Sequence, residues 1–427
     1  MKIYEYPDRK DWPAIVGRQK TGAPRQVKDI VSGILSDIRE YGDAKVLEYV
    51  KRLDGFDTDT AGLRVPAEEI EAAAEKLDDG LKEAVRTAAG NIRRFHEAQK
   101  TEDVTVETMP GVICRQKNIP IDRVGLYIPG GTAPLFSTVL MLAVPASIAG
   151  CGKVILCTPA GPQGKVSPAI LYAAHVCGIT EIYKVGGAVA VGAMAYGTGT
   201  VPKVDKIFGP GNSFVTEAKQ QVSQDCAIDM PAGPSEVMIM ADESAVPAFV
   251  ASDFLSQLEH GKDSQAILLS TSGQLADAVL RELELQYGNL KRKSIIDASI
   301  LKSAAVLLSS EDEMAEFANY YAPEHLIIAT RNYQDTVEKI RNAGSVFLGN
   351  YSTESAGDYA SGTNHTLPTS GWAVSCSGVN LSAFMKKMTI QEISRSGLEL
   401  LGPVIEKMAM AEGLDAHANA VRVRLER

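Results

Sequence analysis

The sequence has few cysteines, and no two of them form a CxxC pair. Its six cysteines are scattered over 427 residues, at positions 114, 151, 157, 177, 226 and 376. A disulfide framework or a thiolate metal site, the two alternatives, would need closely or regularly spaced cysteines. We therefore interpret these thiols as small buried hydrophobic groups in a reducing compartment.

The sequence also lacks an export signal and an uninterrupted membrane span. The N-terminus, MKIYEYPDRKDW, carries charges where a signal peptide has an apolar run. Residues 124–152 contain no charged side chain, but Pro129, Pro134 and Pro145 divide them into pieces too short to cross a bilayer. We expect a cytoplasmic protein with no membrane partner.

An excess of basic residues is absent as well. The chain has 43 Lys and Arg against 53 Asp and Glu, a net charge of −10. This balance argues against a nucleic-acid partner and favours a small molecule. Heptads and low-complexity tracts are also missing, so the chain is expected to be globular. The chain is too long to fold around a single compact core, which predicts two or more domains.

What the sequence does contain is an alternation of short apolar strands and helices. Strand-like runs occur from residue 124 (VGLYI, VILC, EIYKV, DKIF) and again after residue 235 (VMIM, AILLS, AVLLS, LIIAT, SVFL). Helix-like stretches separate them, at about 137–149, 167–176, 188–196, 213–223, 246–259, 273–286, 311–320 and 332–342. Continuous apolar strands between helices predict parallel sheets covered on both faces.

We therefore predict an α/β fold with two Rossmann-like parallel-sheet units. The Pro- and Gly-rich segment 229–236 (DMPAGPSE) is the expected crossing between them. Residues 27–53 and 67–99 have apolar residues at helical spacing. The chain after residue 379 is also expected to be helical.

Six histidines are few enough to be considered one by one. His96 and His175 lie in helical patterns and are interpreted as solvated or core histidines. The other four follow residue 255 and stand beside acidic or amide side chains, in SQLEHG, APEHL, GTNHTLP and EGLDAH. The second half of the chain is therefore where catalytic chemistry is expected.

Two of these strings bring together groups that suit catalysis. Gln257 and His260 are three residues apart near a predicted helix end, so they share one face and could supply two metal ligands. The simpler alternative is a histidine favoured by the helix dipole. Glu324 and His325 precede a strand and could divide proton transfer between carboxylate and imidazole. The simpler alternative there is a loop with two exposed polar residues.

The segment 355–365 (SAGDYASGTNH) is predicted to be a glycine-rich loop after the strand SVFLGN. Loops at the carboxyl ends of strands bind ligands in open α/β sheets. Asp358 and His365 lie on it. Glutamine, histidine and aspartate side chains would form a nitrogen and oxygen ligand set suited to zinc. The spacing alone does not establish that set.

Two glycine turns offer possible phosphate sites. PGGTAPLFS (129–137) and IFGPGN (207–212) each follow a strand and open toward a helix, where backbone N–H groups could meet a phosphate. Neither turn is GxGxxG, so ordinary tight βα turns remain an alternative to dinucleotide binding.

Several long strings resemble histidinol dehydrogenases, in the order of that family. They are GLYIPGGTAPLFSTVLM, VPKVDKIFGPGN, IDMPAGPSEVMIMAD, SDFLSQLEHG, YAPEHL, SAGDYASGTNHTLPT and AEGLDAHANAVRVRL. The resemblance extends from about residue 124 to the C-terminus. It implies oxidation of L-histidinol through L-histidinal to L-histidine with two NAD and one zinc ion per subunit.

The resemblance also assigns roles to individual residues. Zinc would be held by Gln257, His260, Asp358 and His417, the last from a partner subunit, which implies a domain-swapped homodimer with an intersubunit active site. Glu324 and His325 would transfer protons. The expected substrate-binding residues are Ser235, Gln257, His260, His325, Asp358, His365, Glu412 and His417. The expected NAD contacts are Tyr127, Asn212 and Val189.

Val189 is a departure from the family, which usually has glutamine there. Valine cannot supply that amide hydrogen bond, so we expect weakened or rearranged NAD contact. The variant segment 371–384 has no interpretation. A non-catalytic relative is disfavoured because the proton-transfer pair and the ligands are present. A relative that oxidises another alcohol is disfavoured by Glu412.

These inferences lead to one domain division. Residues 1–22 are expected to form an N-terminal extension, and residues 23–128 with 235–378 a large discontinuous α/β domain. Residues 129–234 would form the Rossmann-like NAD-side domain. Residues 379–427 would be a helical C-terminal extension that reaches the partner subunit.

Overall fold

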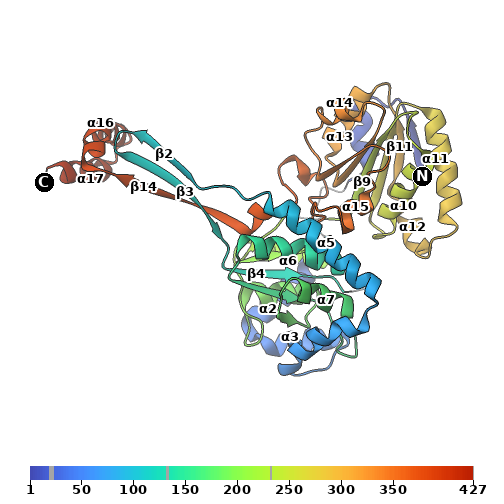
Figure 1. The fold of residues 1–427 in the computed structure, drawn as a ribbon, viewed down its shortest axis with the longest axis horizontal. Helices are drawn as coiled ribbons and strands as arrows, with labels where there is room; N and C mark the ends of the chain where they lie inside the picture. Colours follow the sequence, from blue (N-terminus) through green and yellow to red (C-terminus); the bar gives the residue numbers. More distant parts are fainter. Residues whose placement is uncertain (19–23, 131–133, 231–232, 427) are drawn as a thin grey trace.

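The computed structural model describes residues 1–18, 24–130, 134–230 and 233–426. It contains two α/β bodies and one long arm (Figure 1). We name the bodies by their sheets, the five-stranded unit and the six-stranded unit. The arm consists of an antiparallel three-stranded sheet and the last two helices.

The five-stranded unit has a parallel sheet in the order β6-β5-β4-β7-β8. Its strands are β4 (Arg123–Tyr127), β5 (Lys153–Cys157), β6 (Glu181–Tyr183), β7 (Lys206–Phe208) and β8 (Ala227–Ile228). The crossover helices are α6 (Phe136–Ala149), α7 (Pro168–Val176), α8 (Gly187–Tyr196) and α9 (Ser213–Val222). Successive strand residues point to opposite faces, so Val124 and Leu126 enter one apolar cluster and Tyr127 the other.

The helical N-terminal region completes this unit. Its helices are α2 (Arg25–Tyr41), α3 (Asp43–Tyr49), α4 (Ala67–Glu71) and α5 (Asp79–Glu97), with short turns at Val50–Asp54, Ala61–Leu63 and Ala72–Lys76. Helix α2 packs on α8 and α9, and α5 packs on α6. The apolar stripe of α2, Val31, Ile34, Leu35 and Ile38, lies in the same cluster as α8.

The six-stranded unit is also parallel, in the order β1-β11-β10-β9-β12-β13. Its strands are β1 (Lys2–Glu5), β9 (Glu236–Ala241), β10 (Gln265–Ser270), β11 (Ala304–Leu307), β12 (His325–Ala329) and β13 (Ser345–Leu348). Its helices are α1 (Trp12–Val16), α10 (Pro247–Leu258), α11 (Gly273–Tyr287), α12 (Lys293–Ser299), α13 (Glu311–Tyr321), α14 (Tyr333–Val337) and α15 (Glu354–Tyr359). Short 3-10 turns cover Arg9–Asp11, Ile300–Lys302, Trp372–Val374 and Leu381–Phe384.

The arm extends away from both units (Figure 1). Strands β2 (Val104–Met109), β3 (Val112–Pro120) and β14 (Met385–Ile393) form its antiparallel sheet, and α16 (Arg395–Ala411) packs on α17 (Asp415–Leu425) at its tip. The tip depends on a close approach of two glycines. A Cβ on Gly397 would lie 2.4 Å from the carbonyl oxygen of Gly111, so a larger residue would separate α16 from the hairpin turn.

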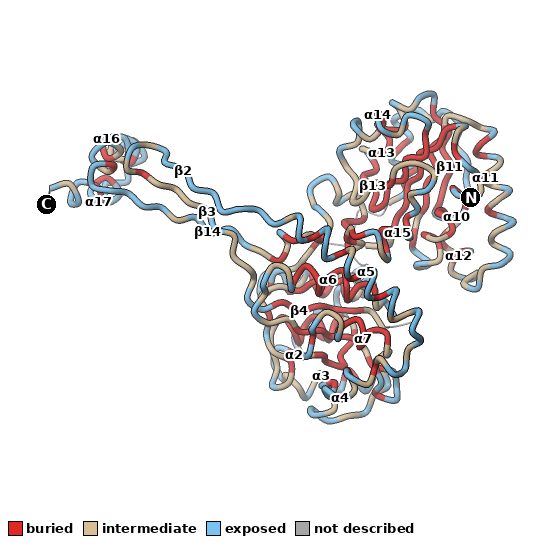
Figure 2. Tube along the Cα trace, viewed as in Figure 1, coloured by how far each residue is buried: buried red, intermediate tan, exposed pale blue. Residues whose placement is uncertain are grey.

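Most of the arm is exposed (Figure 2). The exposed apolar side chains on it are Val104, Val106, Met388, Ile393, Leu400, Val404, Met408, Met410, Leu414 and Val423. Exposed apolar patches are common where proteins bind a partner.

The structure confirms the α/β fold with two parallel sheets and the nine predicted strands. All six cysteines are free thiols. The expectation of a purely helical C-terminal region was wrong, because β14 pairs with β3 over nine residues before α16 begins. The β2–β3 hairpin was not predicted, since β2 is largely exposed, β3 is mostly half-buried and neither strand has a buried apolar run.

The sheets group the chain differently from the predicted domain division. β1 is an edge strand of the six-stranded sheet and Trp12 is buried beneath it, so the first residues are part of that unit. β4 pairs with β5 and β7, and α2 and α5 pack on the helices of that sheet, which joins residues 25–97 and 123–127 to the five-stranded unit. Among the described residues, no helix combines the length and apolar character that crossing a bilayer requires.

The base of the arm provides a test of the packing. Phe384 is fully buried and stacks on Phe208 of β7 with 4.0 Å between ring centroids. Phe384→Ala should destabilise the protein by about 3–5 kcal/mol, because it leaves a cavity where β14 leaves the body. Thermal unfolding followed by circular dichroism would measure it, with the more exposed Phe249→Ala as matched control. Equal loss in both variants would contradict this role.

Candidate active site

A glutamate and a histidine at the start of β12 form the centre of the candidate active site. Glu324 and His325 are both buried. Glu236, which begins the neighbouring strand β9, donates its backbone N–H to Glu324 Oε2 at 2.8 Å. The carbonyl oxygen of Glu236 lies 3.2 Å from His325 Nδ1. Because a carbonyl only accepts, Nδ1 carries a hydrogen in either protonation state, and Nε2 is the nitrogen that gains or loses a proton.

Three carboxylates surround the His325 ring. Nδ1 lies 3.7 Å from Glu324 Oε2 and 3.8 Å from Glu354 Oε1, and Nε2 lies 3.6 Å from Asp358 Oδ1. Burial acts to lower the pKa of His325, but the negative charges of these carboxylates raise that pKa to about 10. Burial raises the pKa of Glu324 to about 8 and that of Glu354 above its ordinary value. The cluster thus concentrates negative charge away from water.

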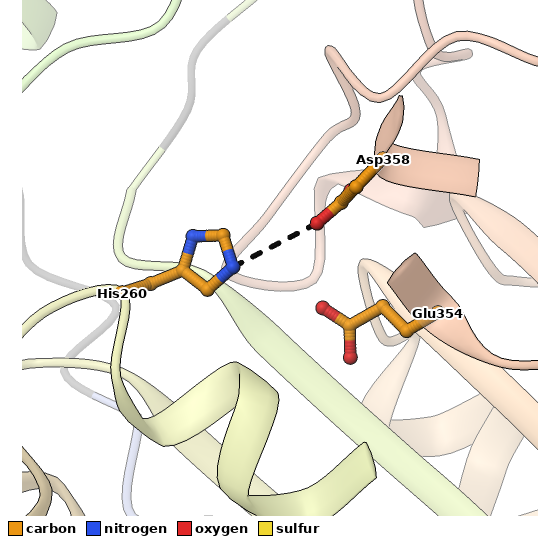
Figure 3. Close-up of side chains that lie close together, drawn as sticks. All are labelled: His260, Glu354 and Asp358. Atoms are coloured by element: carbon orange, nitrogen blue, oxygen red, sulfur yellow. Dashed lines mark ion pairs between the residues drawn. The ribbon is translucent and has the colours of Figure 1, made fainter. Parts of the chain in front are cut away.

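A group of possible metal ligands adjoins His325. One ligand atom each from His260, Glu354 and Asp358 lie within 4.8 Å of one another, and all three side chains point into the same space (Figure 3). His260 Nε2 is 3.7 Å from Asp358 Oδ2. These residues come from the end of α10 and from α15.

Unpaired polar atoms support a cation at this place. Among the described residues, neither the amide oxygen nor the amide nitrogen of buried Gln257 has a hydrogen-bond partner, and neither do the two carboxylate oxygens of Glu354. Buried polar atoms are normally paired, so these unpaired oxygen and nitrogen atoms fit a site that holds a cation. An imidazole with carboxylate and amide oxygens is a donor set that suits zinc.

The prediction that residues 355–365 form a loop throughout was wrong. Residues 354–359 form α15, so Glu354 and Asp358, four residues apart, lie on one helix face. The site therefore meets the amino ends of β9 and β12, because α10 and α15 return to that edge of the sheet. Sequence reasoning missed Glu354. The four-residue spacing between two carboxylates was the available signal.

His365 connects the site to the other unit. Its Nδ1 donates to the carbonyl oxygen of Asp358 at 2.8 Å, and its Nε2 lies 3.1 Å from the hydroxyl of Thr138 on α6. Asn364 Nδ2 donates to the carbonyl oxygen of Met141 at 2.6 Å. The site thus lies where the two units meet. Ser235 directly precedes Glu236 and is partly exposed.

The predicted NAD contacts lie on the five-stranded unit, toward the carboxyl ends of its strands. Tyr127 ends β4, and its buried hydroxyl accepts the Gly187 N–H at the start of α8, at 3.1 Å. Val189 is buried in the apolar cluster beneath α8. Asn212 caps α9, accepting from the backbone N–H groups of Phe214 and Val215.

A buried ion pair holds the turn that carries Asn212. Gly209 donates its N–H to Asp229 at 2.9 Å, and its carbonyl oxygen accepts from Lys219 Nζ at 2.9 Å. Lys219 and Asp229 also pair with each other. A Cβ on Gly209 would lie 2.1 Å from the carbonyl oxygen of Tyr127, so only glycine fits. The other predicted turn, 129–137, includes residues 131–133, which lie outside the described residues.

Two predicted site residues are not brought to this pocket by their own chain. Glu412 ends α16 and His417 lies on α17, and both are exposed at the tip of the arm. Figure 1 places this tip at the far end of the projection from both units. Among the other predicted residues, His260, Glu324, His325, Asp358 and His365 lie together.

Comparison with known proteins gives a consistent match along the chain. The sequence profile of the family described as histidinol dehydrogenase matches residues 17–425. The histidinol dehydrogenase of Bacteroides fragilis is 54% identical over 427 residues, covering 100% of this chain and 99% of the relative. That of Escherichia coli is 52% identical over 411 residues, covering 96% and 93%. The crystal structure of the Elizabethkingia anophelis enzyme superposes with a TM-score of 0.96 at 49% identity, covering 100% of this chain and 98% of that one.

The ligand geometry predicts a loss of metal binding on one conservative change. Asp358→Asn removes the charge but keeps the size, and we expect Zn²⁺ affinity to fall by at least the roughly 100-fold typical of losing a strong outer-shell partner. Metal content after equilibrium dialysis would measure this. Asp263→Asn, on an exposed carboxylate paired with Lys302, is the matched control. Unchanged zinc content in Asp358→Asn would rule out this ligand position.

Proposed function

We propose, since the chain belongs to the histidinol dehydrogenase family, that it oxidises L-histidinol through L-histidinal to L-histidine with two NAD and a bound zinc ion. The observation that carries the proposal is the buried Glu324–His325 pair beside the ligand group of His260, Glu354 and Asp358. Two oxidations at one carbon need a base for the hydroxyl proton and a group that activates water. This pair supplies one of each.

His325 is suited to the alcohol step. Its Nδ1–H is engaged by the carbonyl oxygen of Glu236, so Nε2, on the side where Asp358 lies, is the nitrogen that exchanges a proton. With Nε2 deprotonated, a substrate hydroxyl placed there would lose its proton to Nε2 while hydride leaves for the nicotinamide. The bond to Glu236 fixes the ring, so no ring reorientation is needed before the transfer.

Glu324 is suited to the aldehyde step. One carboxylate oxygen is held by the N–H of Glu236, and the pKa raised by burial lies near neutral pH. A carboxylate with such a pKa can take a proton from water at physiological pH, and efficient acid–base catalysis needs this match. The resulting aldehyde hydrate is the species from which the second hydride would leave.

Zinc would be held by Gln257, His260 and Asp358 of this chain together with His417 of a second copy. The buried, unpaired amide of Gln257 supports this assignment. Zinc has no redox chemistry of its own, and when bound it polarises and orients the groups that ligate it. Glu354 is close enough to share in this site.

NAD would bind at the carboxyl ends of the five-stranded sheet, where open α/β sheets take nucleotides. Tyr127 and Asn212 are the expected contacts, and the Lys219–Asp229 pair keeps the turn before Asn212 in shape. Val189 packs in the core, so its contribution to NAD binding would come from the backbone at the start of α8 rather than from a side-chain amide.

The second subunit enters through the arm. Glu412 and His417 lie on a tip that exposes many apolar side chains, and the same chain's pocket is too distant to use them. A second copy that covers this surface would bring both residues to the partner's pocket. There Ser235, His365 and Glu412 would contact histidinol.

The stoichiometry tests the proposal directly. The wild-type protein should form two NADH per histidinol, because the alcohol and aldehyde are oxidised in turn. His325→Ala should slow histidinol oxidation at least about 100-fold, whereas Glu324→Ala should mainly slow oxidation of added histidinal. Stopped-flow NADH absorbance would separate the steps. Exposed His175→Ala and Glu338→Ala serve as controls, and equal losses at both steps would refute the division of roles.

Mixing two inactive variants tests the shared site. In a heterodimer of His417→Ala with Glu324→Ala, one pocket has an intact pair and an intact partner arm. Random mixing should therefore restore about one quarter of wild-type activity. His417→Ala mixed with Glu412→Ala places a defect in both arms, so that mixture should stay inactive. An arm that acts within its own chain would give no recovery in the first mixture.

A further inference from the structure

Arg18 is a buried cation that the proposed reaction does not use. Its guanidinium pairs with the Glu236 carboxylate, and the exposed fractions of the two side chains are only 9% and 5%. It also donates to the carbonyl oxygen of Tyr321 and, at 3.4 Å, to that of Ala322. The guanidinium carbon lies 3.4 Å from the centroid of the Tyr321 ring.

The partners of Arg18 are the residues that hold the proton-transfer pair. Glu236 positions Glu324 with its N–H and His325 with its carbonyl oxygen. Tyr321 and Ala322 lead into Pro323 and the pair itself. Arg18 therefore links the two backbone segments that meet at the pair.

One of these segments is held in an unfavourable conformation. Ala322 has φ +51°, in the left-handed region that residues with a side chain seldom adopt. Such a conformation persists only when surrounding contacts maintain it, and it is common near active sites. The bonds from Arg18 to the carbonyl oxygens of Tyr321 and Ala322 are contacts of this kind.

The chemistry of the position favours arginine over lysine. The planar guanidinium can bond a carboxylate and two carbonyl groups at once while lying on an aromatic ring, which a single ammonium cannot do. It also compensates the charge of Glu236, whose second carboxylate oxygen accepts the Ser370 N–H at 3.1 Å. Without Arg18, Glu236 would be a buried, unpaired carboxylate beside Glu324.

We infer that Arg18, acting through Glu236, is a positioning residue for Glu324 and His325. It contacts neither the metal ligands nor the pocket and acts through the backbone of its partners. The expected change in kcat rests on the proposed function. The expected change in the hydrogen bond between His325 Nδ1 and Glu236 rests on the structure alone.

The kinetic test uses Arg18→Ala in the full-length enzyme. We expect kcat for histidinol oxidation to fall about 100-fold, the effect of misplacing catalytic groups by about 1 Å, with KM changed less than about threefold. Guanidinium chloride at low millimolar concentration should restore kcat at least tenfold, whereas sodium chloride of equal ionic strength should not. Arg9→Ala, an exposed arginine paired with Glu316, is the matched control.

Arg18→Lys covers the case in which the alanine variant does not fold. Lysine keeps the charge but lacks the planar guanidinium with its several N–H donors. We expect about a tenfold lower kcat and an unfolding temperature near that of the wild type. In both variants, ¹⁵N spectra of the histidine rings should show that His325 has lost the Nδ1–H hydrogen bond to the carbonyl oxygen of Glu236. This readout needs no substrate.

The outcomes separate the two hypotheses. A wild-type protein that fails to reduce NAD with histidinol would refute the proposed function, while the His325 spectra would still decide the role of Arg18. The inference would be overturned if the His325 Nδ1–H hydrogen bond were unchanged and kcat stayed within twofold of wild type. A loss of kcat that follows thermal stability and does not respond to guanidinium would also overturn it.

Discussion

Buried negative charge is the constraint on which this site depends. Glu324, Glu354 and Asp358 surround one imidazole, and His260 lies beside Asp358. Desolvated carboxylates without a matching cation are strongly unfavourable. Burial therefore raises the pKa of Glu324 and Glu354, so that these two groups hold a proton more readily than a solvated carboxylate. A divalent cation at the ligand group would compensate the same charge and favour the ionised carboxylates.

The same constraint explains the packing around the pair. The backbone of Glu236 is bonded to both Glu324 and His325, and the Glu236 side chain needs its own cation, Arg18. Charge compensation therefore extends outward from the metal ligands to a second, permanent ion pair. The N-terminal segment that carries Arg18 is tied to the site although it is remote in sequence.

Much of the fold could be predicted from periodicity, because nine strands have continuous apolar runs that a doubly covered sheet requires. The arm could not, since β2 and β14 are largely exposed and the pairing of β14 with β3 joins residues hundreds of positions apart. Individual site residues could be named from local chemistry and family resemblance. Glu354 was missed although its four-residue spacing from Asp358 was a local signal. Arg18 was missed because nothing local distinguishes a buried guanidinium from a solvated one.

The thin arm has a consequence for how activity would depend on amount of protein. Under the proposed assembly, an isolated chain carries a pocket that lacks a ligand and a tip whose apolar side chains face water. Dilution would separate the subunits and so remove the partner's metal ligand from each site. Specific activity would therefore fall as the protein concentration falls. Zinc binding would strengthen the association of the subunits, and association would strengthen zinc binding, because residues of both chains complete the same coordination shell.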